Sequence, residues 1–363
     1  MNGWRVARIG GIDIRVDPSF LVITLLITSS LWSSFTDPFR HPRLTTLQVI
    51  ALALLSALLF FLSILGHELA HAGMSRALGI PVLGIALFTF GGATYTKAEG
   101  QRPIDEFLTT LVGPLSSAAI GGLLLLAHAQ LNLPDTLSLI FDYLGRLNLF
   151  LAIYNALPSY PLDGGRILRS IVWQVTGDST KATLTAARTG QVVSGAMIAF
   201  AAYRIFSAQD YGWLWFGVIA VMLFSLSSNA VADVRRQRTL SAATASQVMS
   251  PPPPSVPADL PLGEALARYL DGHEGEAFPV TQEGRVVGFV SLTTARGVAS
   301  DRPVIDATVP PGAVAVADAS DTLDAIVDRL GQREVAAVLV MHAGQLVGII
   351  EPADVNRFLR DGR

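Results

Sequence analysis

The sequence predicts an α-helical polytopic membrane protein, with about six transmembrane helices and a small interfacial β-hairpin or sheet, followed by a soluble α/β tail. The first observation is composition: the 363 residues are 51% hydrophobic and only 15% charged, and the mean hydropathy is +0.47. The second is distribution, because the apolar runs lie before about Ala232, whereas Asp, Glu, Arg and Pro return from Ala243 onward. The third is an internal repeat in the tail. The chain therefore divides into two domains that belong to two solvents.

Charge and cysteine content exclude several functions. The formal net charge is -3, the pI is near 6.1, and no block is rich in Lys or Arg, so we expect no nucleic-acid partner. The chain has no cysteine, which excludes disulfides and thiolate metal sites. Any metal must therefore be held by His, Asp or Glu.

Six apolar stretches approach the length that a membrane-spanning helix requires, which is roughly 20 residues. They run from Phe20 to Phe35, Leu47 to Leu78, Phe107 to Leu131, Leu147 to Leu162, Gly190 to Phe206 and Trp213 to Ala232. The fourth stretch is short and ends in prolines, and the fifth is rich in Ala and Gly. No small-residue cleavage site closes the first segment, so we expect it to remain as an anchor.

Basic residues around these stretches predict the orientation of a multi-pass protein in the cell membrane. Six spans place both termini on one side, and Arg and Lys favour the cytoplasm. Basic residues precede the first span and follow the last, at Arg5, Arg8, Arg15, Arg235, Arg236 and Arg238. Arg40 and Arg43, in the first predicted outer loop, depart from this pattern. We expect both termini and the tail to be cytoplasmic.

A non-helical segment separates the second and third predicted spans. Residues 80–100, IPVLGIALFTFGGATYTKAEG, combine β-branched and aromatic side chains with turn glycines, which predicts a strand or hairpin. Open strand edges cannot face lipid, so this segment must lie at the interface or against protein.

The tail contains two copies of one α/β unit. It begins near the proline-rich MSPPPPSVP, which we expect to act as a stiff spacer or turn. The segment EALARYLDGHEGEAFPVTQEGRVVGFVS aligns with DAIVDRLGQREVAAVLVMHAGQLVGIIE, about sixty residues later. This repeat resembles a tandem cystathionine-β-synthase (CBS) domain pair. We expect a transmembrane domain over residues 1–240 and a CBS pair over 244–363, with copies at about 244–300 and 304–363.

The motif GHELAH, inside the second predicted span, carries the chemistry. His67 and His71 are about 400° apart around a helix, so they project from one face on consecutive turns. Glu68 is angled to reach a water on a shared ion without ligating it. This is the HExxH pattern, in which one helix supplies two metal ligands and a general base. The alternative is that the histidines snorkel or cap at the cytoplasmic end of the helix.

A third ligand is expected from a carboxylate near another span. The segment LAIYNALPSYPLDGGRILRS offers Asp163, where Pro158 and Pro161 end the fourth span and two glycines free the backbone. The second and fourth spans run in the same direction, which places His67, His71 and Asp163 at similar depth. Spacing alone equally allows Asp163 to be a helix N-cap.

The chain resembles the site-2 protease family of intramembrane zinc metalloproteases, in the branch that carries CBS domains after six spans. The resemblance covers nearly the whole chain. It rests on GHELAH at 66–71, NALPSYPLDGGR at 155–166, FGGATY between the second and third spans, and LVGPLSS from Leu111. It implies a zinc metalloendopeptidase that hydrolyses peptide bonds in or near transmembrane segments of membrane-protein substrates, under the influence of a cytosolic regulatory tail.

The resemblance also implies roles for individual residues. Glu68 would be the catalytic base. Asn155 would stabilise the tetrahedral intermediate, and an amide that bonds between helices is the alternative. The ligands of one zinc ion per chain would be His67, His71 and Asp163. The edge strand that receives unwound substrate by β-augmentation would include Phe90, Gly91 and Gly92.

CBS pairs commonly bind adenine nucleotides through a hydroxyl residue and, three positions on, an aspartate. The first copy has Ser291 but Thr294 in place of the aspartate. The second has Asp354 but Glu351 in place of the hydroxyl, and a carboxylate there would repel phosphate. These departures argue against nucleotide binding through Ser291 and Asp354, which the resemblance otherwise implies. A packing module, or a homodimer formed through the CBS pair, is the alternative expectation.

Two rival functions fit parts of the pattern. A transporter or channel with a CBS tail predicts polar residues on several spans along a path, whereas here they gather at one place. An inactive relative that holds membrane clients without cutting them is not favoured, because the HExxH residues and Asp163 are all present. The expected partners are the lipid bilayer and a transmembrane protein substrate.

Overall fold

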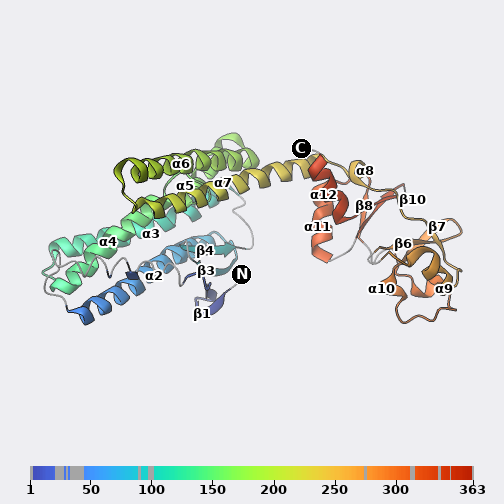
Figure 1. Ribbon diagram of the computed structural model, residues 1–363, viewed down its shortest axis with the longest axis horizontal. Coiled ribbons are helices and arrows are strands. Elements are labelled where there is room, and N and C mark those ends of the chain that lie inside the picture. Colours follow the sequence, from blue (N-terminus) through green and yellow to red (C-terminus); the bar gives the residue numbers. More distant parts are fainter. Residues whose placement is uncertain are drawn as a thin grey trace. The chain divides into compact units, whose positions relative to one another are not determined.

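The computed structural model describes residues 3–20, 28, 29, 32, 45–88, 91–96, 102–273, 276–310, 315–333, 337–343 and 345–361. The chain forms two compact units, Met1–Val231 and Ala232–Arg363 (Figure 1). The extents of the membrane domain and of the two CBS copies, as assigned from the sequence, stay predictions.

Long helices dominate the first unit. Within the described residues, five helices are long and apolar enough to cross a membrane. They are α2 (Thr46–Ala77), α3 (Pro103–Gln130), α4 (Asp135–Asn155), α6 (Ser179–Ala208) and α7 (Trp213–Ala242). Helix α3 packs against both α2 and α4. The helical polytopic class is confirmed, and the span predicted at 20–35 lies mostly outside the described residues.

Local signals set the helix starts. Thr45 precedes α2 in a capping box, in which its hydroxyl accepts from the Gln48 amide and the Gln48 side chain accepts from the Thr45 amide. Pro103 opens α3, at a position where its missing N–H costs no helical hydrogen bond.

The limits predicted for the fourth span were wrong. Helix α4 covers 135–155 rather than 147–162, because it begins directly after Pro134 and the chain turns at Ala156, ahead of the prolines at 158 and 161. A separate short helix, α5 (Asp163–Thr176), follows the turn and ends at Gly177, which has φ of 70°.

A four-stranded sheet lies against α2 in the order β1-β2-β3-β4. Its strands are β1 (Trp4–Ile9), β2 (Ile12–Val16), β3 (Val82–Phe88) and β4 (Gly91–Thr96). Strands β3 and β4 form the expected antiparallel hairpin, and β2 pairs with β3 in parallel. The β1–β2 hairpin was missed by the sequence analysis. Strand β4 is an edge of the sheet, and α2 packs against it.

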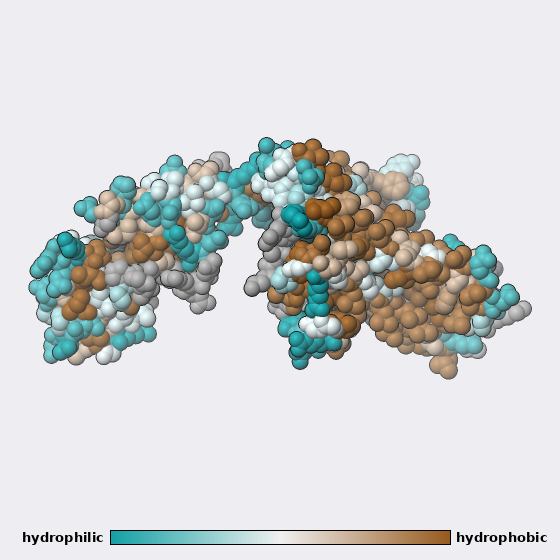
Figure 2. Space-filling view, turned by 180° about the vertical axis from the view of Figure 1, so that it is seen from behind, coloured by the Kyte–Doolittle hydropathy of each residue, from teal (hydrophilic) through white to brown (hydrophobic). Residues whose placement is uncertain are grey.

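Apolar side chains occupy both the interior and the exterior of the first unit. Phe60 and Ile64 of α2, Ile85 of β3, and Ile140 and Leu144 of α4 belong to one buried cluster. Large apolar side chains also cover the outside, including Leu54, Leu58, Leu123, Phe150, Val192 and Val221. Figure 2 shows brown over these helices and more teal over the second unit. An apolar exterior matches lipid, so this is a multi-pass membrane unit.

The second unit contains two copies of one three-stranded motif. Its strands are β5 (Val256–Pro257), β6 (Phe278–Gln282) and β7 (Arg285–Val290), then β8 (Val316–Asp318), β9 (Val338–His342) and β10 (Gln345–Ile350). Its helices are α8 (Ala245–Val248), α9 (Leu262–Ala265), η1 (Leu266–Leu270), α10 (Leu292–Ala295), η2 (Val304–Ala307), α11 (Leu323–Arg333) and α12 (Pro352–Asp361). Each copy pairs its first two strands in parallel and its last two antiparallel, and each has its own apolar core.

Gly288 and Gly348 occupy the same position in the last strand of each copy, and both allow close packing. A Cβ on Gly288 would come 2.4 Å from the carbonyl oxygen of Val309, and one on Gly348 would come 2.6 Å from Met249 Sδ. Glycine is therefore required in both copies because another segment crosses the last strand there.

Candidate metal centre

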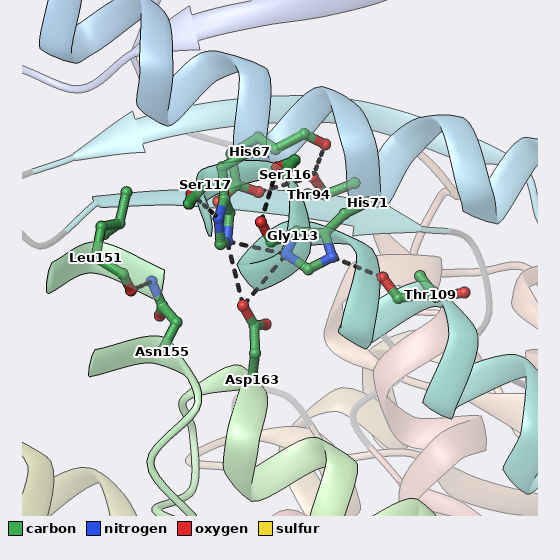
Figure 3. Close-up of polar contacts among 11 residues, drawn as sticks. His67, His71, Thr94, Thr109, Gly113, Ser116, Ser117, Leu151, Asn155 and Asp163 are labelled. Carbon is green, nitrogen blue, oxygen red and sulfur yellow. Dashed lines mark hydrogen bonds and ion pairs between the residues drawn. The ribbon is translucent and has the colours of Figure 1, made fainter. Parts of the chain in front are cut away.

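Three ligand atoms from two helices converge in the first unit (Figure 3). His67 and His71 lie on consecutive turns of α2, and their Nε2 atoms are 3.1 Å apart. Asp163, the first residue of α5, places Oδ2 3.2 Å from His67 Nε2 and 3.4 Å from His71 Nε2. Leu162 is the N-cap of α5. The Asp163 carboxylate therefore faces the two imidazoles rather than serving as the cap.

Helix α3 orients both imidazole rings. His71 Nδ1 lies 2.7 Å from the carbonyl oxygen of Thr109. A carbonyl only accepts, so Nδ1 carries the proton and Nε2 keeps its lone pair. His67 Nδ1 lies 2.9 Å from the Ser117 hydroxyl, which can accept in the same way. Two nitrogen lone pairs and a carboxylate oxygen thus face one point, an arrangement that a cation stabilises.

The spacing of these atoms fits a tetrahedral metal site. Metal–ligand bonds of about 2.0–2.2 Å at tetrahedral angles place the ligand atoms about 3.3 Å apart, and the observed separations run from 3.1 to 3.4 Å. His67 and His71 are 4% and 8% exposed. Two imidazoles and a carboxylate, without thiolate, form a donor set that suits zinc.

Gly113 on α3 leaves the space that the cluster occupies. A Cβ at this position would come 2.2 Å from His71 Nε2 and 2.7 Å from His67 Nε2. Real atoms do not approach so closely, so any larger residue would displace the imidazoles. The site therefore depends on a residue without a side chain in the helix that crosses α2.

Glu68 projects from α2 toward β4. Its Oε2 lies 2.8 Å from Thr94 Oγ1, and the side chain is 6% exposed. A Cβ on Gly92 would come 2.4 Å from Glu68 Cγ. Strand β4 therefore shapes the pocket that holds this carboxylate.

A cavity of about 420 Å³ reaches the ligand cluster. Asn155, at the end of α4, lines it and donates from Nδ2 to the Leu151 carbonyl oxygen at 3.1 Å. Gly91 and Gly92 line it as well, whereas Phe90 lies outside the described residues. Helix α7 forms an apolar wall, with Trp215, Phe216, Ile219, Met222, Leu223 and Leu226. The cavity therefore joins a polar cluster to a surface suited to apolar side chains.

A buried ion pair holds α5, and with it Asp163, against α3. Arg169 Nη1 lies 2.6 Å from both carboxylate oxygens of Glu106, and its Nε donates to the Thr183 hydroxyl on α6. Glu106 is 3% exposed. Removing either partner would leave the other charge buried.

The two glycines after Asp163 are needed because their surroundings leave no room for a side chain, and not because of backbone freedom. A Cβ on Gly164 would come 2.2 Å from the carbonyl oxygen of Ala156, and one on Gly165 would come 2.3 Å from Tyr160 N. Neither glycine has the positive φ that only glycine adopts readily. The chain from 156 to 162 can therefore fold closely onto the start of α5, which places Asp163.

Of the two candidate nucleotide residues, the structure brings Asp354 to a cavity. That cavity, of about 430 Å³, is lined also by Glu351, His273 and Glu276, and among the described residues Ser291 does not line it. Asp354 accepts from the Ser250 hydroxyl at 2.8 Å. Burial, followed by the charges of Asp354 and Glu276, raises the pKa of Glu351. Ser291 instead caps α10, since its hydroxyl accepts from the Thr294 amide.

Several residues at the site were missed by the sequence analysis. Ser117 and Gly113 lie in LVGPLSS, which was singled out as a motif without a role for either residue. Thr94 lies in FGGATY in the same way. Apart from their opposite charges, nothing in the sequence indicates that Arg169 and Glu106 pair.

Comparison with known proteins identifies the family. A model of "Peptidase family M50" matches residues 120–200, and a CBS-domain model matches residues 245–301. A candidate zinc metalloprotease of Synechocystis sp., sll0528, is 31% identical over 99% of this chain and 96% of its own. The chain belongs to peptidase family M50. The candidate zinc metalloprotease Rip3 of Mycobacterium tuberculosis is also 31% identical to this M50 chain, over 98% of it and 92% of its own length.

The M50 chain is similar to a site-2 protease from Methanocaldococcus jannaschii, with 22% identity, a TM-score of 0.45, and coverage of 63% of this chain and 95% of that chain. The resemblance to site-2 proteases is confirmed by the family match and the curated relatives. The roles of individual residues stay predictions.

Proposed function

We propose that this chain is an intramembrane zinc metalloendopeptidase that hydrolyses peptide bonds in or near transmembrane segments of membrane-protein substrates. One observation carries the proposal: His67, His71 and Asp163 converge beside Glu68 in a cavity walled by apolar helices. Membership of family M50 supports the same class of reaction.

The proposed roles follow from the positions of the side chains. His67, His71 and Asp163 would hold one zinc ion per chain, which when bound supplies the Lewis acidity that activates water and polarises a carbonyl. Glu68 would accept a proton from the water and pass it to the leaving amine. Asn155, on the cavity wall, would donate a hydrogen bond to the developing oxyanion.

Strand β4 would receive the substrate as an additional strand. A helical substrate hides its carbonyls in hydrogen bonds, so it must unwind before the cut. Strand β4 is an edge strand that lines the cavity, and Gly91 and Gly92 place no side chains there. Main-chain hydrogen bonds to such an edge would hold an extended peptide. Weak helix formers near the cut would therefore favour cleavage.

Replacing the base tests the proposal. Glu68→Gln removes the proton acceptor and keeps the three ligands, so cleavage of a membrane-anchored reporter should be lost while the protein still carries one zinc ion per chain. Glu264→Gln is the control, because this side chain is 54% exposed in the second unit. The control should cleave like the wild type. Wild-type cleavage by Glu68→Gln would refute the assignment.

We further propose that both termini and the CBS pair are cytoplasmic. Arg235, Arg236 and Arg238 near the end of α7 favour that side.

In the CBS pair, the cavity beside Asp354 would take an adenine nucleotide, although Glu351 opposes phosphate there. A homodimer through the pair is the alternative regulatory role. Calorimetry of the full chain with ATP, ADP and AMP, together with measurement of its oligomeric mass, separates the two.

A further inference from the structure

The carboxylate of Glu68 is held by the strand that would receive substrate. The Thr94 hydroxyl lies 2.8 Å from Glu68 Oε2 and 3.1 Å from the Glu68 main-chain oxygen. A hydroxyl has one proton to donate, and the shorter, charge-assisted bond to the carboxylate is the stronger of the two. Thr94 therefore fixes the end of the Glu68 side chain.

Two neighbouring positions on one face of strand β4, 92 and 94, lie against the Glu68 side chain. Side chains alternate along a strand, so positions 92 and 94 share a face, and that face meets α2. At position 92 a Cβ would come 2.4 Å from Glu68 Cγ and 2.7 Å from Oε1, so glycine gives the side chain room. At position 94 the hydroxyl meets its end. The space left by Gly92 and the hydrogen bond from Thr94 together favour one position of the Glu68 carboxylate.

We propose that Thr94 is a positioning residue for the catalytic base. Its hydroxyl sets the orientation of the Glu68 carboxylate relative to β4, and therefore relative to a peptide paired with the open edge of β4. Strand β4 would then set the distance between the base and the scissile amide. The rate of the catalytic step depends on such distances. The inference rests on the proposed function of Glu68 and β4.

Substitutions that separate the hydroxyl from the bulk of the side chain test this inference. Thr94→Val keeps the shape and removes the hydroxyl, so kcat for the reporter should fall by about 10- to 100-fold, with KM and zinc content unchanged. Thr94→Ser keeps the hydroxyl, so its kcat should stay close to that of the wild type. Thr185→Val is the matched control, because that exposed hydroxyl donates to the Lys181 carbonyl of its own helix. It should leave kcat unchanged.

The outcomes distinguish this inference from the proposed function. If Glu68→Gln abolishes cleavage but Thr94→Val has wild-type kcat, the role of Thr94 is refuted and the proposed function stands. If Thr94→Ser loses as much activity as Thr94→Val, packing rather than the hydroxyl is responsible, and the inference is again overturned. If Thr94→Val does not fold, the ratio of kcat between Thr94→Ser and Thr94→Ala decides, and equal values refute the inference.

Discussion

Gly113→Ala adds one methyl group at the point where α3 crosses the ligand-bearing turns of α2. The new Cβ would come 2.2 Å from His71 Nε2 and 2.7 Å from His67 Nε2. Carbon and nitrogen atoms in contact are about 3.5 Å apart, so at least one imidazole must move by about 1 Å or more. Functional sites tolerate errors of about 0.5 Å. The proposed zinc geometry therefore cannot survive the substitution unchanged.

We expect Gly113→Ala to weaken zinc binding by at least about 100-fold and to reduce reporter cleavage accordingly. Gly122→Ala is the matched control, because it lies on the same helix and its Cβ would meet nothing within 4 Å. Zinc titration of metal-free protein against a competing chelator measures the affinity, and thermal unfolding reports on the fold. Equal zinc affinity in the two variants would refute the reasoning.

Three further predictions concern the surroundings of the site and the tail. Ser117→Ala removes the partner of His67 Nδ1 and should weaken zinc binding by about 10- to 100-fold in the same titration; unchanged affinity would contradict the orienting role. Arg169→Met leaves the buried Glu106 carboxylate with the longer contact to Arg166 Nε, 3.7 Å from Oε1, and should lower the free energy of unfolding by up to about 3–5 kcal/mol, whereas the double variant with Glu106→Leu should recover most of it; additive losses in chemical unfolding would argue against the pair. Folding raises the pKa of Glu351, so its ionisation destabilises the folded state as pH rises, and Glu351→Gln should raise the unfolding temperature at pH 8 more than at pH 4; equal shifts would contradict this.

The sequence predicts best the part of the site that lies on one helix. Helical periodicity alone places His67 and His71 on consecutive turns of one face, with Glu68 beside His67. Asp163 needed one more step, the common direction of two spans, and the structure places its Oδ2 3.2 and 3.4 Å from the two imidazoles. The placement of these side chains follows from local geometry and chain direction, and their roles stay predictions.

The spacing of residues in the sequence does not predict which residues of a crossing helix contact the site. Which residues of LVGPLSS face α2 depends on the crossing angle and rotation of α3, and neither follows from spacing. The contacts of Gly113 and Ser117 with the two histidines are therefore seen only in the structure. The pairing of Arg169 with Glu106 has the same origin, since 63 residues separate the partners.

The β1–β2 hairpin is different, because its signal was present. Gly10 and Gly11 have φ of 55° and 81°, and a Gly-Gly pair between short strand-like segments is a hairpin signal.

Zinc K-edge X-ray absorption on the purified chain at neutral pH identifies the ligands of the proposed site. The proposed site predicts one zinc ion per chain, with nitrogen and oxygen ligands at about 2.0–2.2 Å and no sulfur, and the loss of that signal in His67→Ala and Asp163→Ala. Protein that carries no zinc, or a zinc environment that is the same in Asp163→Ala as in the wild type, would contradict it.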